Sequence, residues 1–405
     1  MKKNNKAPKL RFSGYTDDWE QRKLGELSSS FEYGLNVAAK EYDSENKYIR
    51  ITDIDDESRE FKQEDITSPD IDLSSAENYR LSEGDILFAR TGASVGKSYI
   101  YKASDGLVYY AGFLIRARIK PEYNSGFVFQ NTLTGDYEKF IKVTSMRSGQ
   151  PGVNAQEYSQ YQIMVPSKPE QDKISDCLRN IDHLITLHQR KLEKLQNMKK
   201  SCLQKMFPKD GVTVPEIRFS EFQGDWEERT LGSCFDERLE SLPDGELLSV
   251  TIGSGIKKFS ELDRHDNSNT DKSKYKRVCI GDIAYNSMRM WQGASGRSPY
   301  EGIVSPAYTV VKPIGDIDTQ FFAYMFKKKE IIHLFEINSQ GLTSDTWNLK
   351  YPAFSKIVVR VPRNVEEQSR IARFLLELDD LISCTEQEIE ITKRMKKGCL
   401  QKMFV

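Results

Sequence analysis

Apolar residues recur at helical spacing in two long stretches of the chain. In the first stretch they follow at alternating intervals of three and four, skipping only His188, and they are Ile174, Leu178, Ile181, Ile185, Leu192 and Leu195. In the second stretch they are Ile371, Leu375, Leu378, Ile382 and Ile389, interrupted by the polar Thr385 and Thr392. This spacing is typical of a coiled-coil seam. It predicts two helices of about 38 residues, ending near Phe207 and Phe404, each roughly 57 Å long.

Two other segments, 26–166 and 233–362, have a different pattern. Short β-branched and aromatic runs, such as residues 48–54, alternate there with turns rich in Gly, Asn, Ser and Asp. Such runs predict strands, and one helix interrupts each segment, near 127–133 and 319–326. Each segment is therefore predicted to be an α+β domain with mixed strands.

The chain contains an internal repeat. Residues 8–25 recur as 215–232, and residues 170–207 recur in unbroken register as 367–404. Because the same seam occurs twice, packing of the two long helices on each other is favoured over a helix folded onto its own domain, which stays the alternative. The repeat also predicts a pseudo-twofold axis. The blocks in common indicate a scaffold, and the divergent segments between them indicate the part that varies with function.

The predicted organisation has four consecutive parts. A first globular domain covers residues 1–166 and is followed by a long helix at 167–208. A second globular domain covers 209–362 and is followed by a second long helix at 363–405. The fold class is therefore α+β, with two globular domains of mixed strands and short helices separated by two packed long helices.

Composition restricts the classes of function. The 405 residues suit two or more domains, and 59 basic residues nearly balance 60 acidic ones, so a nucleic-acid surface would have to be a local patch. The six cysteines form no Cys-x-x-Cys pair and only four histidines are available, which argues against structural zinc or a disulfide framework. Neither a membrane-spanning apolar run nor a secretory signal is evident, so we expect a cytoplasmic protein.

Three short motifs approach those of enzymes without matching them. Residues 91–98 resemble a phosphate-binding loop, but three residues separate the two glycines where four are needed. Residues 305–308, Ser-Pro-Ala-Tyr, resemble an amino-methyltransferase motif but have the wrong first polar residue and lack the second proline. The Pro-Asp pair at 69–70 is not followed by the Glu-x-Lys of a nuclease. The sequence therefore predicts no catalytic residue and no metal site.

The repeated blocks come with three further strings, at residues 84–90 (GDILFAR), 281–293 (GDIAYNSMRMWQG) and 304–308 (VSPAY). In this arrangement they resemble the specificity subunit of type I restriction-modification systems, a bacterial defence, over essentially the whole chain. The resemblance implies that the two domains are target-recognition domains, each reading half of a split site in double-stranded DNA. It also implies that the two helices form an antiparallel coiled coil that sets the gap between the half-sites.

The resemblance further implies partner subunits. Two modification subunits would bind S-adenosylmethionine and methylate adenine, and restriction subunits would use ATP and Mg to translocate and cut. This chain would then be a non-catalytic specificity subunit that carries no cofactor itself.

Base reading requires polar side chains on loops that reach the grooves of DNA. In the first domain we expect these to be Arg90, Thr91, Lys97, Arg147 and Gln150. In the second domain we expect Asn286, Arg289, Trp291, Gln292, Arg297, Ser344 and Trp347, close to glycines that permit close backbone approach. The alternative at each position is a solvated loop residue.

Two other functions remain open from sequence. A protein-binding adaptor with a coiled-coil scaffold would bind independently of salt, whereas a DNA reader loses affinity steeply as salt rises. A stand-alone nuclease or methyltransferase is disfavoured by the missing motifs, and a turnover assay with S-adenosylmethionine or magnesium distinguishes it.

Overall fold

The computed structural model describes residues 7–146, 151–209, 211–253, 255–263, 265, 268, 270–342 and 346–405. The chain forms two compact units, one made of Met1–Gln189 with Gln387–Val405 and the other of Arg190–Glu386. Each unit thus contains one globular domain and part of both long helices. The division into four consecutive segments remains a prediction.

The first unit is built on a four-stranded antiparallel sheet. Its strand order is β2 (Ser28–Tyr33), β9 (Leu114–Ile119), β6 (Ile86–Ala89) and β7 (Ser98–Ile100). Three two-stranded pairs accompany it, which are β1 (Glu20–Lys23) with β10 (Gln162–Val165), β3 (Ala39–Glu41) with β5 (Thr67–Pro69), and the parallel pair β4 (Asn46–Ile49) with β8 (Leu107–Tyr110). The short helices are α1 (Leu24–Leu27), α2 (Ser125–Asn131), α3 (Gly135–Ser145) and α4 (Ala155–Ser159).

The second unit repeats this plan. Its antiparallel sheet has the order β12 (Phe235–Glu237), β19 (Tyr308–Pro313), β16 (Ile283–Asn286) and β17 (Ser295–Arg297). The strand pairs are β11 (Glu227–Thr230) with β20 (Val358–Val361), β13 (Leu248–Thr251) with β14 (Gly255–Lys258), and β15 (Lys276–Val278) with β18 (Gly302–Val304). The short helices are α6 (Leu231–Cys234), α7 (Thr319–Met325), α8 (Lys329–Ile337) and α9 (Tyr351–Phe354). The predicted α+β class and internal repeat are confirmed.

One helix in each domain was expected, and the structure has a second directly after it. In the first domain this is α3, whose sequence is mostly polar and which buries only one side, including Tyr137 and Ile141. In the second domain it is α8, which begins within a run of lysines. Both are too short for their periodicity to stand out against the loops around them.

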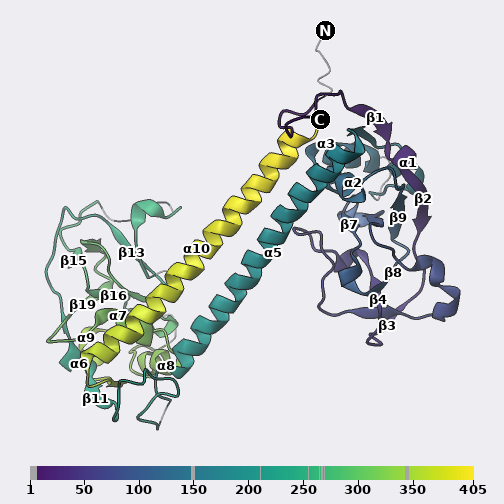
Figure 1. Cartoon of the computed structure of the whole chain (residues 1–405). Coiled ribbons are helices and arrows are strands. Elements are labelled where there is room, and N and C mark those ends of the chain that lie inside the picture. Colours follow the sequence, from purple (N-terminus) through teal and green to yellow (C-terminus); the bar gives the residue numbers. More distant parts are fainter. Residues whose placement is uncertain are drawn as a thin grey trace. The chain divides into compact units, whose positions relative to one another are not determined.

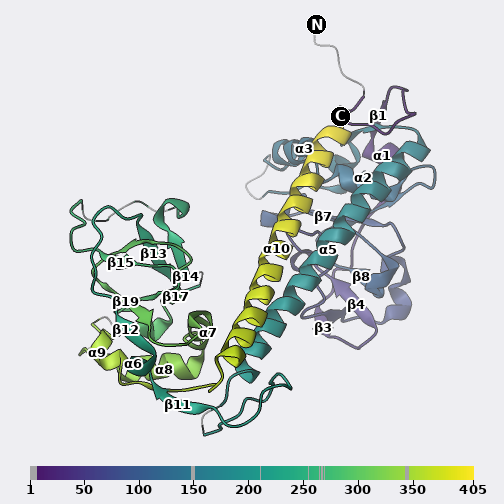
Figure 2. The ribbon, with the colours of Figure 1, turned by 60° about the vertical axis from the view of Figure 1, so that its left-hand side comes forward.

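The two long helices are α5 (Lys168–Lys205) and α10 (Val365–Met403), with 38 and 39 residues. Figures 1 and 2 show them side by side. The seam residues toward the start of each helix, together with Ile389, are buried: Ile174, Leu178, Ile181, Ile371, Leu375, Leu378 and Ile389. Those nearer the middle are half-buried: Ile185, Leu192, Leu195 and Ile382.

The polar interruptions of the seam are satisfied within their own helix. Thr385 is buried, and its hydroxyl donates to the Leu381 carbonyl oxygen at 2.7 Å. Thr392 donates in the same way to the Glu388 carbonyl oxygen at 2.7 Å. This back-bonding lets a polar residue occupy a seam position without an unpaired hydroxyl.

The direction of the helices is visible within the first unit. Asp182 of α5 pairs with Lys396 of α10 at 2.7 Å, and His188 lies 3.0 Å from Glu388. Residue numbers thus rise along α5 while those of the partners fall along α10. The helices are therefore antiparallel, as predicted.

The same ion pair occurs once in each unit. In the second unit Lys199 pairs with Asp379. Under the sequence repeat, Lys199 corresponds to Lys396 and Asp379 corresponds to Asp182. The packing of the two helices therefore carries the same pseudo-symmetry as the domains.

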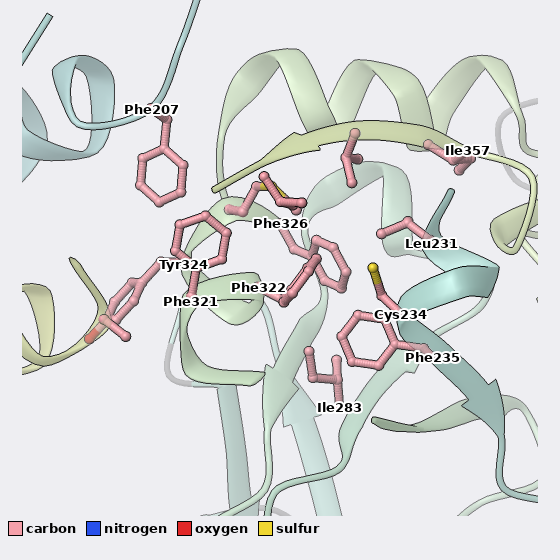
Figure 3. Packing of buried hydrophobic residues seen from close by; sticks show 14 of the residues in the cluster. Phe207, Leu231, Cys234, Phe235, Ile283, Phe321, Phe322, Tyr324, Phe326 and Ile357 are labelled. Atoms are coloured by element: carbon pink, nitrogen blue, oxygen red, sulfur yellow. The ribbon is translucent and has the colours of Figure 1, made fainter. Parts of the chain in front are cut away.

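Each domain core is closed by the end of a helix from the other half of the chain. In the first unit Phe404, after α10, stacks on Phe127 at 5.3 Å between ring centroids. In the second unit Phe207, after α5, stacks on Phe321 at 5.2 Å, and Figure 3 shows Phe207 beside Tyr324 and Phe321. Aromatic side chains bury large apolar areas, so each stacked pair contributes strongly to the stability of its domain core.

The two repeated N-terminal blocks are held by equivalent buried ion pairs. Arg11 makes two hydrogen bonds, of 2.7 and 2.9 Å, to the Glu170 carboxylate. Arg218 makes two, of 2.7 and 2.8 Å, to Glu367. Both carboxylates are buried in the first turn of their helix, where negative charge is favourable. The motif containing Trp19 and Trp226 is thereby anchored to the start of each long helix.

Replacing Phe404 with Ala should destabilise the first unit although the residue lies at the far end of the chain. We expect a loss of about 3–5 kcal/mol in the free energy of unfolding, the usual cost of truncating a buried Phe. Urea unfolding of the full chain, followed by limited proteolysis of the first domain, measures it. Val405→Ala is the control, because Val405 is exposed. An unchanged stability of F404A would contradict closure of the core by this residue.

Candidate nucleic-acid interface

Equivalent strands of the two domains lead into two loops that contain half of the predicted DNA-binding residues. We call residues 90–97 the β6 loop and residues 287–294 the β16 loop. The Val153 amide donates to the Arg90 carbonyl oxygen at 2.9 Å, and the Leu349 amide donates to Ser287 at 2.8 Å. In both domains the loop is thus tied to the segment that precedes α4 or α9.

In the β6 loop, Arg90 stacks on an aromatic ring. Its guanidinium carbon lies 5.0 Å from the ring centroid of Tyr33, within the range of a cation–π contact. The Arg90 amide donates to the carbonyl oxygen of Phe113, a side chain that is 60% exposed. Thr91 is half-buried and forms a β-bridge with Gly152. A cation, two aromatic rings and a short backbone ladder therefore meet at this surface.

The β16 loop contains a pair of tryptophans from distant parts of the sequence. Trp291 and Trp347 make an edge-to-face contact with ring centroids 5.3 Å apart. The Trp291 indole donates to the Met288 carbonyl oxygen at 3.1 Å. A β-bridge between Gln340 and Asn348 holds the segment that carries Trp347.

Polar side chains surround this aromatic pair. Arg289 is exposed and donates to the Gln292 side chain at 3.2 Å. The Asn286 side chain accepts from the Met288 amide at 3.0 Å. Asn286, Arg289, Trp291, Gln292 and Trp347 are thus brought together at one place.

Two other predicted residues are bound into the domains. Lys97 is 7% exposed; its ammonium donates to the Ile54 carbonyl oxygen at 3.1 Å and pairs with Asp56 at 2.5 Å. Arg297 is half-buried and donates to the Thr319 hydroxyl at 3.0 Å, at the start of α7. Their cationic groups hold the domain together in this structure. Arg147, Gln150 and Ser344 lie outside the described residues.

Sequence reasoning missed several exposed apolar side chains. They are Met288 in the β16 loop, and Tyr33, Phe113 and Leu342 in other segments of the two domains; Leu342 is fully exposed. Phe113 follows Ala-Gly between the two strongly apolar strands β8 and β9, and this turn position was a usable signal of exposure. The other three carry no sequence signal that separates them from core residues.

Among the described residues, no group of three or more His, Cys, Asp or Glu is arranged to hold a metal ion. Within the same part of the chain, no helix is long and apolar enough to span a membrane. In residues 91–98, the lysine that a phosphate-binding loop would use is Lys97, which is paired with Asp56.

Each of the two similar domains carries a loop with cationic and aromatic side chains in or beside it. Residues 16–197 match the type I restriction modification DNA specificity domain. The chain is also similar over nearly its whole length to specificity subunits of type I restriction enzymes.

Relatives in Methanocaldococcus jannaschii match nearly the whole chain. The type I restriction enzyme MjaX specificity subunit is 23% identical, covering 98% of this chain and 95% of its own length. The MjaVIII specificity subunit is 22% identical, covering 94% and 91%. A crystal structure of the type I S subunit from M. genitalium has a TM-score of 0.63 at 14% identity, covering 98% of this chain and 99% of that one. The last similarity shows the fold.

Replacing Lys97 with Met should lower the stability of the first unit without changing which DNA is bound. The change leaves the Ile54 carbonyl without its donor, and we expect a loss of about 1–3 kcal/mol. Thermal unfolding measures it. The control is Lys102→Met, because Lys102 pairs with Glu60 at the surface and should cost less than about 1 kcal/mol. A variant K97M of unchanged stability but altered DNA preference would instead place Lys97 in the interface.

Proposed function

We propose that this chain is the DNA-binding subunit of a type I restriction-modification complex and that each domain reads one half of a bipartite site. The observation that carries the proposal is the equivalent position of the β6 and β16 loops in the two repeats of a specificity subunit. The loops differ in sequence, so the two half-sites should differ as well.

The side chains of the loops suit base reading. The edge of the Arg90 guanidinium can donate two hydrogen bonds to guanine, as arginine commonly does in the major groove. The amides of Asn286 and Gln292 suit adenine, and Arg289 adds a second cation in the same loop. Trp291 and Trp347 supply apolar surface for contact with a thymine methyl group.

With a net charge of −1, this chain alone carries too little positive charge to neutralise the DNA backbone. In the proposed complex, modification subunits contribute to this neutralisation. They also supply S-adenosylmethionine and adenine methylation, and restriction subunits supply ATP- and Mg-dependent cleavage. This chain acts in the cytoplasm and catalyses no step itself.

Exposed apolar residues on the long helices support docking of two modification subunits. In the first unit Leu184 and Met395 are exposed, and their repeat equivalents Leu381 and Met198 are exposed in the second unit. Apolar side chains exposed at equivalent positions are expected where two copies of one partner bind a pseudo-symmetric scaffold.

The first test is to map methylated adenines in cells that carry this chain and its methyltransferase. We expect modification at a single split motif with a constant gap. Arg90→Ala should relax one half of the motif only, and Arg289→Ala should relax the other half only, because the two residues lie in different domains. Each lost base contact costs about 1–3 kcal/mol of discrimination. Methylation that ignores both substitutions, or DNA binding insensitive to salt, would contradict the proposal and favour the protein-binding adaptor.

A second test concerns the helices as the ruler of the gap. Seven residues inserted after Gln189 in α5, with seven more before Gln387 in α10, preserve the seam register. They lengthen each helix by about 10 Å, and the gap should widen by about three base pairs while the half-sites stay the same. The control is insertion into α5 alone, which breaks the register and should abolish methylation. An unchanged gap in the double insertion argues against the ruler.

A further inference from the structure

The second domain contains a lysine whose partners are main-chain carbonyls. Lys327 follows α7, and its ammonium donates to the carbonyl oxygens of Gly293 at 2.6 Å, Ser295 at 2.8 Å and Ile252 at 3.0 Å. An ammonium has three N–H donors, so all of them are used. Among the described residues, no carboxylate pairs with Lys327.

These carbonyls come from two segments that pack backbone against backbone. Gly293 lies in the β16 loop, directly after Trp291 and Gln292, whereas Ile252 lies in the turn between β13 and β14. The two segments also meet where a Cβ atom on Gly296 would lie 2.8 Å from the Gly255 Cα atom. Such close approach leaves no room for a side chain between the backbones, so Lys327 bonds to both segments from one side.

We propose that Lys327 is a positioning residue whose three hydrogen bonds hold the β16 loop in its DNA-reading conformation, and that loss of its proton loosens this loop. The role of Lys327 in DNA reading rests on the function proposed above, whereas its anchoring of the β16 loop does not.

The surroundings of Lys327 disfavour its charge. Desolvation and, to a smaller extent, the positive charge of Lys199 on α5 together lower the pKa of Lys327 to about 8. Lys199 is itself paired with Asp379, to which the Tyr324 hydroxyl also donates, at 2.7 Å. A neutral amine has only two N–H donors, so above this pKa at least one of the three carbonyls loses its bond.

The direction of the pH effect separates local loosening from unfolding. The pKa of Lys327 is about 8 in the folded chain and 10.5 ordinarily, so between these values the unfolded chain binds more protons. This group therefore makes global stability rise with pH over that window. The three hydrogen bonds from Lys327 to main-chain carbonyls have the opposite pH dependence, because all three form below pH 8 and at least one is lost above it. A measurement of global stability would therefore miss the loosening, and a probe in the β16 loop is needed.

The first domain provides an internal comparison. Alignment of α2 with α7 through Phe127 and Phe321 places Leu133 at the position of Lys327. The carbonyl oxygen of Ile54 accepts instead from Lys97, which has Asp56 as a carboxylate partner. The first half-site should therefore lack this pH response.

The chain has four tryptophans, so the full-length protein labelled with 5-fluorotryptophan should give four ¹⁹F resonances. Those of Trp291 and Trp347, assigned with Phe variants, should move with a midpoint near pH 8. Those of Trp19 and Trp226 should not move there. The movement should be absent in Lys327→Met and retained in Lys329→Met, an exposed neighbouring residue. A Trp291 resonance that is constant from pH 7 to 9.5 in the wild type, or that moves equally in K327M, overturns the proposal.

The DNA part is tested on the complex of the full chain with its methyltransferase at pH 7. K327M should reduce discrimination against single-base changes in the second half-site by about tenfold, as expected for lost bonds to a charged group, and leave the first half-site unchanged. Lys329→Met should affect neither. A ¹⁹F response without this loss rejects the role in DNA reading and keeps the anchor. If the complex with the unsubstituted chain does not methylate a split site, the proposed function is rejected, whereas the ¹⁹F result on the loop remains valid.

Discussion

The structure depends on the closure of each domain core by a helix end from the other half of the chain. Phe404 stacks on Phe127 and Phe207 stacks on Phe321, so neither half can bury its own aromatic cluster alone. An antiparallel helix pair is the arrangement that brings the end of each helix to the start of the other. Within each unit the long helices and the globular domain consequently share one hydrophobic core, which explains why both are repeated together.

The repeated contacts mark the scaffold, and the unmatched ones mark the variable part. The Asp182 carboxylate accepts a hydrogen bond from Gln130, and its repeat equivalent Asp379 accepts one from Tyr324. Different residue types thus donate to equivalent carboxylates of the long helices. In the loops the two halves diverge further. Lys97 and Lys327 reach the carbonyl oxygens of Ile54 and Ile252 from unrelated elements. The two halves therefore differ in how lysines contact the main chain, as expected when the scaffold is constrained and the recognition loops are free to change.

The near-neutral charge of the chain is consistent with the proposed division of labour within a larger complex. The Arg90 guanidinium of the β6 loop is held in place by its contact with the Tyr33 ring. Such ordered side chains favour discrimination between bases over strong attraction to phosphate, because a fixed donor geometry distinguishes base edges whereas net charge does not.

The sequence by itself determined the helices, the repeat and the α+β class, because periodic burial is recorded locally at residues such as Leu178 and Leu375. It also singled out the strings at 84–90 and 281–293, which contain the strands β6 and β16 that lead into the two loops. Tertiary structure alone decided that Trp291 meets Trp347 and that Lys97 is buried. Those outcomes depend on contacts between segments far apart in the chain, and residue spacing carries no record of which distant segment will supply a partner.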